Sequence, residues 1–318
     1  MREVEGTVTK EYSGHYYIQT DDGLIECAVG SRLRKQLIYP ESASRRRAVD
    51  RVARIRAITP VAVGDRVRAV LTDDETGMIR EVLPRRTKLS RRASGTRDLE
   101  QVVVANVDQL VAVFAAREPD VSRRMLDRFL VLAEAEELRA VICINKTDLV
   151  DLDELRKQMA AYEQIGYSIR YTSALSERGV ADLREALHDK ISVLIGPSGV
   201  GKSTLLNALQ PGLGLRVQMI SQSTGKGKHT TTHVELHPLD FGGMVADTPG
   251  LRELGLWNVP PEDLPYLFPE FRHYLGSCRF AANCAHLQEP DCAVKEAVAN
   301  GCIDPERYES YMRIRSTL

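Results

Sequence analysis

A glycine-rich segment between a buried strand and a helix constrains the fold of this chain more than any other feature. The segment GPSGVGKS spans residues 196–203, follows the apolar run ISVLI and precedes TLLNALQ. Its glycines let backbone N–H groups point at phosphate oxygens, and the helix adds its positive N-terminal end. The pattern predicts a phosphate-binding loop; the alternative is a glycine-rich turn with a surface lysine.

The same pattern assigns roles to individual residues of this loop. We expect Lys202 to reach the β- and γ-phosphates and so to serve catalysis, and the Ser203 hydroxyl to bind magnesium. The residues predicted to contact the nucleotide here are Gly196, Pro197, Ser198, Gly199, Val200, Gly201, Lys202, Ser203 and Thr204.

A second motif, NKTD at residues 145–148, indicates which base the nucleotide carries. It ends the apolar strand AVICI. Guanine presents two donors that the Asp148 carboxylate can accept together, whereas adenine would leave that carboxylate unpaired. Asn145 is expected to bind the other edge of the base, Lys146 to pack over sugar and base, and a backbone N–H of the segment TSA (172–174) to meet guanine O6. The residues predicted to bind the base are Asn145, Lys146, Thr147, Asp148, Ser173 and Ala174.

The segment DTPG at residues 247–250 completes the nucleotide motifs. Asp247 follows the apolar run MVA, where the magnesium-associated carboxylate of a phosphate-loop protein lies, and Gly250 can offer its N–H to the γ-phosphate. Most GTPases carry the phosphate loop before the base motifs, whereas here NKTD and TSA come first. Because a chain can be cut and rejoined at exposed loops without losing its core, this order predicts a circularly permuted P-loop GTPase domain.

Three cysteines and a histidine near the end of the sequence have metal-ligand spacing. Cys278, Cys284, His286 and Cys292 supply three thiolates and one imidazole, a complete tetrahedral shell for zinc. We therefore predict one structural zinc ion per chain; the alternative is a set of reduced, buried side chains. Cys302 is a rival fourth ligand, disfavoured because it is expected to lie within a helical region.

The first 85 residues have the alternating pattern of an all-β domain. Polar and apolar residues alternate through EGTVTKEYSGHYYIQTDDGLIECAV, with hairpin turns at SG and DDG, and VGDRVRAVL and MIREVL add two strands. Five short strands predict an oligonucleotide-binding (OB-fold) barrel. Residues 31–56 hold nine Lys or Arg against two acidic residues although the net charge of the chain is −1, which favours a polyanionic partner; the alternative is a solvated loop.

Together these motifs resemble the circularly permuted bacterial GTPases known as ribosome-small-subunit-dependent GTPase A. The resemblance covers essentially all 318 residues and includes ANVDQL, LDRFL, NKTDL, GPSGVGKSTLLNAL, KHTTTHVEL, DTPG and the Cys/His cluster with EPDCAV. It implies binding of GTP and GDP, docking on the small (30S) ribosomal subunit and its rRNA, GTP hydrolysis stimulated by that subunit, and a role late in subunit maturation. One departure is the gap between Cys278 and Cys284, which is one residue longer than is usual in the family.

Hydrolysis needs a group that orients water, and the glutamine that often follows DxxG is replaced here by Leu251. The segment GKGKHTTT at residues 225–232 is predicted to be the first switch. His229 within it is the candidate catalytic residue, as the resemblance also implies; the alternative is a surface histidine in a basic loop. One threonine of residues 230–232 is expected to close on magnesium in the GTP state, and we select Thr231.

The patterns predict a multidomain α/β protein. Its expected parts are an OB-fold domain at 1–85, a linker at 86–98, the permuted GTPase domain at 99–256 and a C-terminal helical zinc-binding domain at 257–318. The longest apolar run is too short to cross a membrane and MREVEGTVTK lacks the apolar core of a signal peptide, so we expect a cytoplasmic monomer without membrane contact. Two alternatives to a ribosomal GTPase are a guanine-nucleotide-switched RNA-binding module and a GTPase acting on a non-ribosomal partner.

Overall fold

The computed structural model describes residues 2–30, 61–72, 76–92, 100–213, 234–247, 256 and 259–318. The chain forms two compact units: the first comprises Met1–Asp108, Leu187–Val193 and Leu215–Gly255, and the second comprises Gln109–Ala186, Leu194–Gly214 and Leu256–Leu318. The predictions for the basic stretch 31–56, His229, Thr231 and Gly250 lie outside the described residues.

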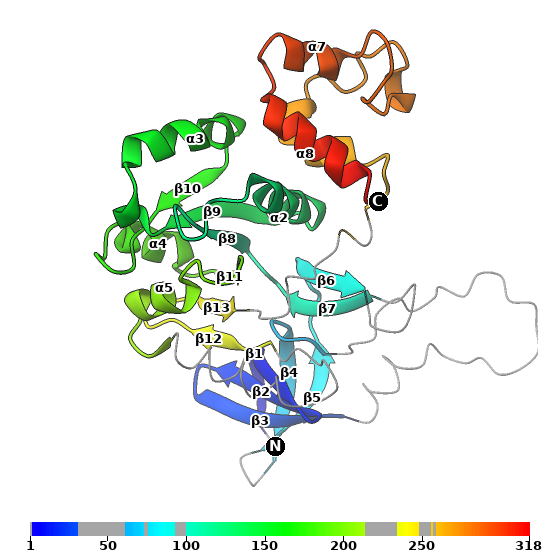
Figure 1. The fold of residues 1–318 in the computed structure, drawn as a ribbon. Coiled ribbons are helices and arrows are strands. Elements are labelled where there is room, and N and C mark those ends of the chain that lie inside the picture. Colours follow the sequence, from blue (N-terminus) through cyan, green and yellow to red (C-terminus); the bar gives the residue numbers. More distant parts are fainter. Residues whose placement is uncertain are drawn as a thin grey trace, which may run out of the picture. The chain divides into compact units, whose positions relative to one another are not determined.

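Five strands of the first unit close into a barrel, as the sequence predicted (Figure 1). They are β1 (Glu3–Tyr12), β2 (His15–Thr20), β3 (Gly23–Val29), β4 (Arg66–Leu71) and β5 (Gly77–Val82). β1 pairs with β4 in antiparallel fashion and β3 pairs with β5 in parallel, which gives the closed order β1-β2-β3-β5-β4 of an OB-fold. The alternation of the sequence places Val8, Ile18, Val67 and Ile79 in the barrel core, where each is fully buried.

A two-stranded sheet of β6 (Lys88–Arg92) and β7 (Glu100–Ala105) follows the barrel in the sequence. Sequence reasoning missed β6, because it lies inside the segment 86–98 that was expected to be a linker. The basic residues that suggested a linker are partners across the sheet instead: Lys88 pairs with Glu100 at 2.5 Å, and Arg91 donates to Gln101 at 3.0 Å.

The phosphate-loop segment belongs to a six-stranded sheet with the order β10-β9-β8-β11-β13-β12. The strands are β8 (Gln109–Ala115), β9 (Arg139–Asn145), β10 (Ser168–Tyr171), β11 (Ile191–Ile195), β12 (Leu236–Pro238) and β13 (Met244–Asp247). β8, β9 and β10 pair in parallel, as expected, while β12 pairs with β13 in antiparallel fashion. Every residue of β8 is buried, which explains why its sequence is continuously apolar rather than alternating.

Capping residues mark the start of two helices of the second unit. The first helical elements of this unit are α2 (Arg123–Ala135), the 3₁₀ turn η1 (Thr147–Leu149), α3 (Leu152–Ile165), α4 (Val180–Leu187) and α5 (Lys202–Leu209). Ser122 caps α2 by accepting from the Met125 N–H. Asp151 caps α3, and Gly166 ends that helix in the left-handed conformation with φ of 105°.

The C-terminal segment also belongs to the second unit. It comprises η3 (Leu264–Leu267), η4 (Pro269–Phe271), η5 (Ala281–Asn283), α7 (Ala293–Ala299) and α8 (Pro305–Arg315). Helix α8, red in Figure 1, lies beside α2, and the two helices are in contact. Within the described ranges, no helix combines the length and the apolar character needed to cross a membrane.

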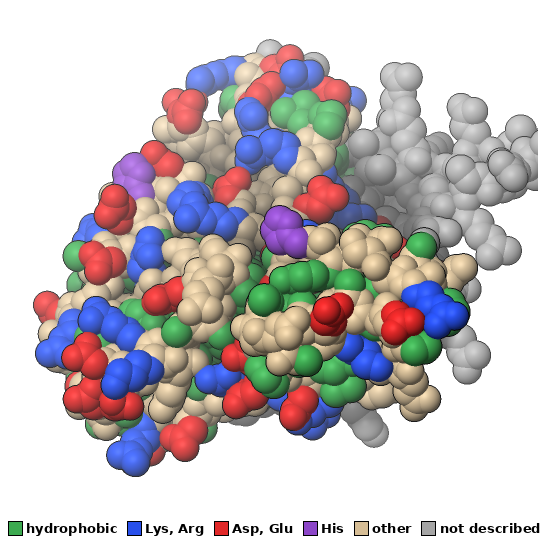
Figure 2. Space-filling view, turned by 90° about the horizontal axis from the view of Figure 1, so that it is seen from above, with side chains coloured by type: hydrophobic (Ala, Val, Ile, Leu, Met, Phe, Trp, Pro, Cys, Tyr) green, Lys and Arg blue, Asp and Glu red, His purple; other side chains and the backbone are tan. Residues whose placement is uncertain are grey.

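Charges of both signs are interspersed on the face of the molecule shown in Figure 2. Some charged side chains form ion pairs along one helix, such as Lys157 with Glu154 on α3 and Arg313 with Glu309 on α8. Exposed pairs of this kind contribute at most about 0.5 kcal/mol each to stability. The basic stretch that suggested a polyanionic partner lies at residues 31–56, outside the described surface.

Candidate nucleotide and metal sites

The phosphate loop joins β11 to α5, and two of its glycines are required by close packing. A Cβ on Gly196 would lie 2.1 Å from the carbonyl oxygen of Val113 on β8. A Cβ on Gly201, whose φ is 89°, would lie 2.6 Å from the side-chain nitrogen of Asn145. Any larger residue at either position would push the loop away from the strands that carry the other motifs.

Lys202 is held at this loop by the loop's own backbone. Its ammonium donates to the carbonyl oxygens of Gly196 at 2.9 Å and Pro197 at 3.0 Å. Ser203 is half-buried in the first turn of α5, and Thr204 is exposed. The cation therefore lies where the glycine pattern predicted it, at the N-terminal end of a helix, an arrangement suited to a phosphate.

Asn145, at the end of β9, ties the predicted nucleotide loops together. Its side chain is buried and its amide nitrogen donates to the Val200 carbonyl of the phosphate loop at 3.0 Å. Its amide oxygen accepts from the Ala174 N–H at 3.1 Å and from the Thr172 hydroxyl at 3.3 Å. Residues from three separate stretches of sequence thus meet at one side chain. The expected contacts of Asn145 and Ala174 with the base stay predictions.

Asp148, the predicted reader of guanine, is positioned by Ser173. The buried Ser173 hydroxyl donates to one carboxylate oxygen of Asp148 and accepts from the Ser176 N–H at 3.2 Å. The Ser173 oxygen accepts from the Ser176 N–H, so the hydroxyl's own proton is the one donated to Asp148. Sequence reasoning assigned this segment only a backbone contact and did not find the role of the hydroxyl.

The other residues of NKTD are also fixed by polar contacts. Lys146 adopts a left-handed conformation, and its ammonium donates to the carbonyl oxygen of Glu118 in the loop after β8. The buried Thr147 hydroxyl donates to the Thr172 carbonyl at 3.0 Å. A pocket of about 650 Å³ adjoins this region and has Asp148 in its wall. At the other predicted position, Asp247 ends β13, and the structure does not describe its side chain.

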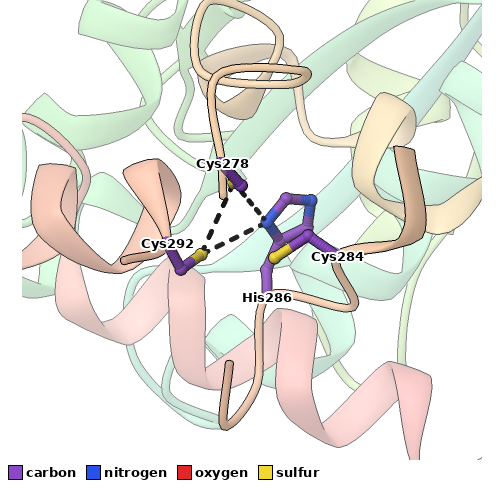
Figure 3. Close-up of side chains that lie close together, drawn as sticks. All are labelled: Cys278, Cys284, His286 and Cys292. Atoms are coloured by element: carbon purple, nitrogen blue, oxygen red, sulfur yellow. Dashed lines mark hydrogen bonds between the residues drawn. The ribbon is translucent and has the colours of Figure 1, made fainter. Parts of the chain in front are cut away.

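The four predicted metal ligands converge in the C-terminal segment (Figure 3). Cys278, Cys284, His286 and Cys292 are all buried, and their ligand atoms lie within 4.8 Å of one another. The sulfurs of Cys278 and Cys292 are 3.8 Å apart, and His286 Nδ1 lies 3.5 and 3.4 Å from them. A tetrahedral ion with metal–sulfur distances of about 2.3 Å needs sulfurs about 3.8 Å apart, so the donor set fits zinc.

Burial favours the uncharged forms of His286 and Cys284 by shifting the pKa of each side chain. Desolvation lowers the pKa of His286 against the opposing effect of Glu289, so the imidazole is neutral and able to bind a metal at neutral pH. Desolvation raises the pKa of the Cys284 thiol to about 12. A bound dication reverses this preference, because it stabilises the thiolate directly.

Residues outside the ligand set hold the metal loop in shape. The Glu289 carboxylate accepts from the Ala285 N–H at 2.9 Å and from the Leu287 N–H at 2.8 Å, one at each oxygen. On α8, the hydroxyls of Tyr308 and Tyr311 donate to the carbonyls of His286 and Ala285 at 2.7 and 2.6 Å. Sequence reasoning missed these residues; the only hint was a glutamate three positions after a ligand.

Cys302, the rival fourth ligand, is not part of the cluster. It is exposed and lies in the loop between α7 and α8, within the helical region where the sequence placed it. Gly301 and Cys302 separate the two helices because the chain turns there, with φ of 75° at Gly301. Cys278, Cys284, His286 and Cys292 form one spatial cluster, and their role as metal ligands stays a prediction.

Comparison with known proteins relates this architecture to one family. The family described as RsgA GTPase matches residues 82–257. The chain is 50% identical over 260 residues to the small ribosomal subunit biogenesis GTPase RsgA of Gemmatimonas aurantiaca, covering 81% of this chain and 84% of that protein. It is 39% identical over 314 residues to the protein of the same name from Caldanaerobacter subterraneus, covering 99% and 95%.

Two solved structures share the fold. The crystal structure of YjeQ from Thermotoga maritima matches with a TM-score of 0.77 and 36% identity, covering 100% of this chain and 99% of that one. The structure of YloQ, described as a circularly permuted GTPase, matches with a TM-score of 0.73 and 32% identity, covering 99% and 95%. The predicted fold, an OB-fold barrel with a circularly permuted GTPase and a C-terminal Cys/His cluster, is thereby confirmed.

Proposed function

This chain belongs to the RsgA GTPase family, and from that premise we propose that it binds the small (30S) ribosomal subunit, is stimulated by it and assists its late maturation. The family is one of GTPases, so the chemical step is hydrolysis of GTP to GDP and phosphate. The observation that carries the proposal is the joining of the phosphate loop, NKTD and TSA by Asn145 in a chain whose near-full-length relatives are named for small-subunit biogenesis. Those names favour a ribosomal GTPase over a guanine-nucleotide-switched RNA-binding module and over a GTPase that acts on a non-ribosomal partner.

The nucleotide site would select guanine and bind its phosphates with different groups. Asp148 accepts from the two guanine donors, and Ser173 keeps its carboxylate oriented for them. The backbone N–H groups of residues 196–204 and the Lys202 ammonium bind the phosphates. In this scheme Lys202 exchanges its contacts with loop carbonyls for contacts with phosphate oxygens, so its role in catalysis is to stabilise charge on the transferred group.

Magnesium would accompany the nucleotide. The Ser203 hydroxyl, the Asp247 carboxylate and the Thr231 hydroxyl are oxygen donors, the ligand type that magnesium prefers. The bound ion neutralises charge on the β- and γ-phosphates. His229 would orient or deprotonate the attacking water, since Leu251 cannot, and Gly250 would offer its N–H to the γ-phosphate.

The C-terminal cluster would hold one zinc ion per chain in a structural role. Its four protein ligands complete a tetrahedral shell and leave no position for a substrate. Bound zinc supplies folding energy rather than reactivity.

The partner would be bound through the barrel and its basic stretch, residues 31–56, which suit a phosphate backbone such as rRNA. We propose that the protein acts as a cytoplasmic monomer without membrane contact. Binding should weaken steeply as salt rises, because phosphate contacts release counterions.

GTP hydrolysis by the purified protein, titrated with purified small subunits, tests this function. We expect turnover to rise with subunit concentration and to saturate. The Lys202→Ala protein with the same subunits measures any contaminating GTPase, and purified large subunits control for non-specific RNA. A rate that does not respond to small subunits would contradict the proposal. A second variant, His229→Ala, should lower turnover while leaving GTP affinity nearly unchanged.

A further inference from the structure

A buried carboxylate on α2 connects the nucleotide-binding part of the second unit to the C-terminal segment. Asp127 is 1% exposed. It accepts from Tyr162 on α3 at 2.9 Å, from Arg307 on α8 at 2.6 Å and from the Ser310 hydroxyl on α8. A charge buried this deeply costs several kcal/mol unless it is fully paired, so the position of α8 on α2 is tightly specified.

Arg307 completes the connection from the other side. It is 1% exposed, and its remaining guanidinium nitrogens donate to Glu270 of η4 at 2.7 and 3.3 Å. Its guanidinium also lies over the rings of Phe268 and Tyr162, 4.7 and 5.6 Å from their centroids. Burial lowers the pKa of Arg307, but its two carboxylate partners raise it above the usual value, so it remains a cation.

The same turn of α8 is bonded to the metal loop. Tyr308 and Tyr311, which immediately follow Arg307 and Ser310, donate to the carbonyls of His286 and Ala285. Tyr308, which is bonded to the backbone of the metal ligand His286, is therefore next to Arg307, which is paired with Asp127 of α2. A change in the conformation of the metal loop removes two hydrogen bonds that hold α8 in place.

The loop that precedes α2 is bonded to the base motif. In this loop the Ala116 N–H donates to the Asn145 carbonyl at 2.7 Å, and the Glu118 carbonyl accepts from Lys146. Asp127 lies in the second turn of the helix that follows. Hydrogen bonds thus join the metal loop to α8, α8 to α2, and the loop before α2 to NKTD, all within one unit; the chain itself joins that loop to α2.

We propose that Asp127 and Arg307 couple the metal cluster to the nucleotide site, so that metal binding at Cys278, Cys284, His286 and Cys292 tightens nucleotide binding. The element with two states is the metal loop with α8, because the folding of such loops depends on their ion. When the metal loop holds its ion, α8 is fixed on α2, and the loop that leads into α2 holds Lys146 and Asn145. By linkage, bound nucleotide tightens metal binding by the same factor.

This inference rests on the metal and nucleotide sites of the proposed function but not on the ribosomal partner. The test measures the dissociation constant of a fluorescent GDP analogue with zinc-loaded protein and with protein stripped by a chelator. We expect stripped wild-type protein to bind GDP about fivefold more weakly or worse, the lower end of typical coupling. In the reciprocal measurement, saturating GDP should slow zinc release to a chromogenic chelator by a comparable factor.

The variant Asp127→Asn keeps the shape of the side chain but removes its charge. In this variant, the ratio of the GDP affinity of zinc-loaded protein to that of stripped protein should fall toward one. Its zinc content and far-ultraviolet circular dichroism should be unchanged. Arg313→Gln is the matched control, since Arg313 is exposed on the same helix and pairs along it with Glu309. It should keep the wild-type ratio.

Two results would overturn the coupling. The first is equal GDP affinity of zinc-loaded and stripped wild-type protein. The second is an Asp127→Asn protein whose GDP affinity depends on zinc as strongly as that of the wild type. If stripped protein does not stay in solution, the zinc-release measurement on loaded protein decides between the same results. Failure of small subunits to stimulate turnover would count against the proposed function alone, since no arm of this experiment contains a ribosome.

Discussion

The nucleotide loops and the metal cluster lie in one unit but organise their polar groups differently. In the nucleotide loops, protein hydrogen bonds already connect the functional side chains: Asn145 bonds two loops, Ser173 orients Asp148, and Lys202 is bound to carbonyls. In the metal cluster, the ligands contact chiefly one another, through sulfur and ring nitrogen at 3.4–3.8 Å. Contacts of that kind are weak, so the cluster would depend on a bound ion for its stability.

This difference teaches that the two sites should fail in different ways. A site organised by protein hydrogen bonds keeps its fold when a functional group is removed, and it loses only the energy of that group. A site organised by an ion loses its fold when the ion is lost. Single substitutions in the two sites therefore separate loss of function from loss of structure.

Cys284→Ser should have the largest effect, because it removes a ligand from the ion-dependent site. We expect loss of the metal and unfolding of the C-terminal segment, since structural zinc contributes on the order of 10 kcal/mol of apparent free energy. Elemental analysis and thermal unfolding measure both. Cys302→Ser, at the exposed cysteine outside the cluster, should change neither. Full metal content in Cys284→Ser would break the comparison.

Lys202→Ala should abolish most turnover without a change in fold. The ammonium donates to two loop carbonyls, and its expected partner in catalysis is the transferred phosphate. By analogy with other groups that stabilise developing charge, we expect turnover to fall about 10²–10³-fold. Lys157→Ala, on the exposed side of α3, is the control. Wild-type turnover in Lys202→Ala would refute the assignment of the phosphate loop.

Asp148→Asn should weaken GTP binding by about 10–150-fold, corresponding to about 1.5–3 kcal/mol for hydrogen bonds to a charged group. An amide cannot accept both guanine donors, but its N–H can donate to the 2-oxo group of xanthine. Preference should therefore shift toward xanthine nucleotides in competition binding. Asp153→Asn, on the exposed surface of α3, should leave the preference unchanged. Unaltered GTP affinity in Asp148→Asn would remove this residue from the base site.

Local sequence was sufficient to predict most of the fold. The five strands of the barrel, the phosphate-loop segment between β11 and α5 and the convergence of the metal ligands all follow from patterns that neighbouring residues determine. Strand β6 was missed because its polar residues are satisfied by a partner strand, which no local pattern reveals. The predicted domain boundaries stay predictions.

Long-range polar contacts are the part that sequence could not supply. Asp127 looks like one acidic residue on a helix, and its partner Arg307 lies 180 positions away. The hydroxyl of Ser173 is likewise given its role by Asp148, 25 positions earlier. Residue type indicates what a group can do, while the fold decides which group it meets.

Ser173→Ala should have the smallest effect and tests whether protein hydrogen bonds organise the base site. The substitution leaves Asp148 in place but removes the donor that orients it, and the Ser176 N–H loses its acceptor. We expect GDP affinity to fall about fivefold, the equivalent of one hydrogen bond of about 1 kcal/mol. Ser176→Ala is a matched control, because its backbone N–H is retained and its exposed side chain takes no part in this contact. Equal GDP affinity in wild type and Ser173→Ala would show that Asp148 is oriented by the nucleotide itself. The base site, like the metal cluster, would then depend on its ligand for its organisation.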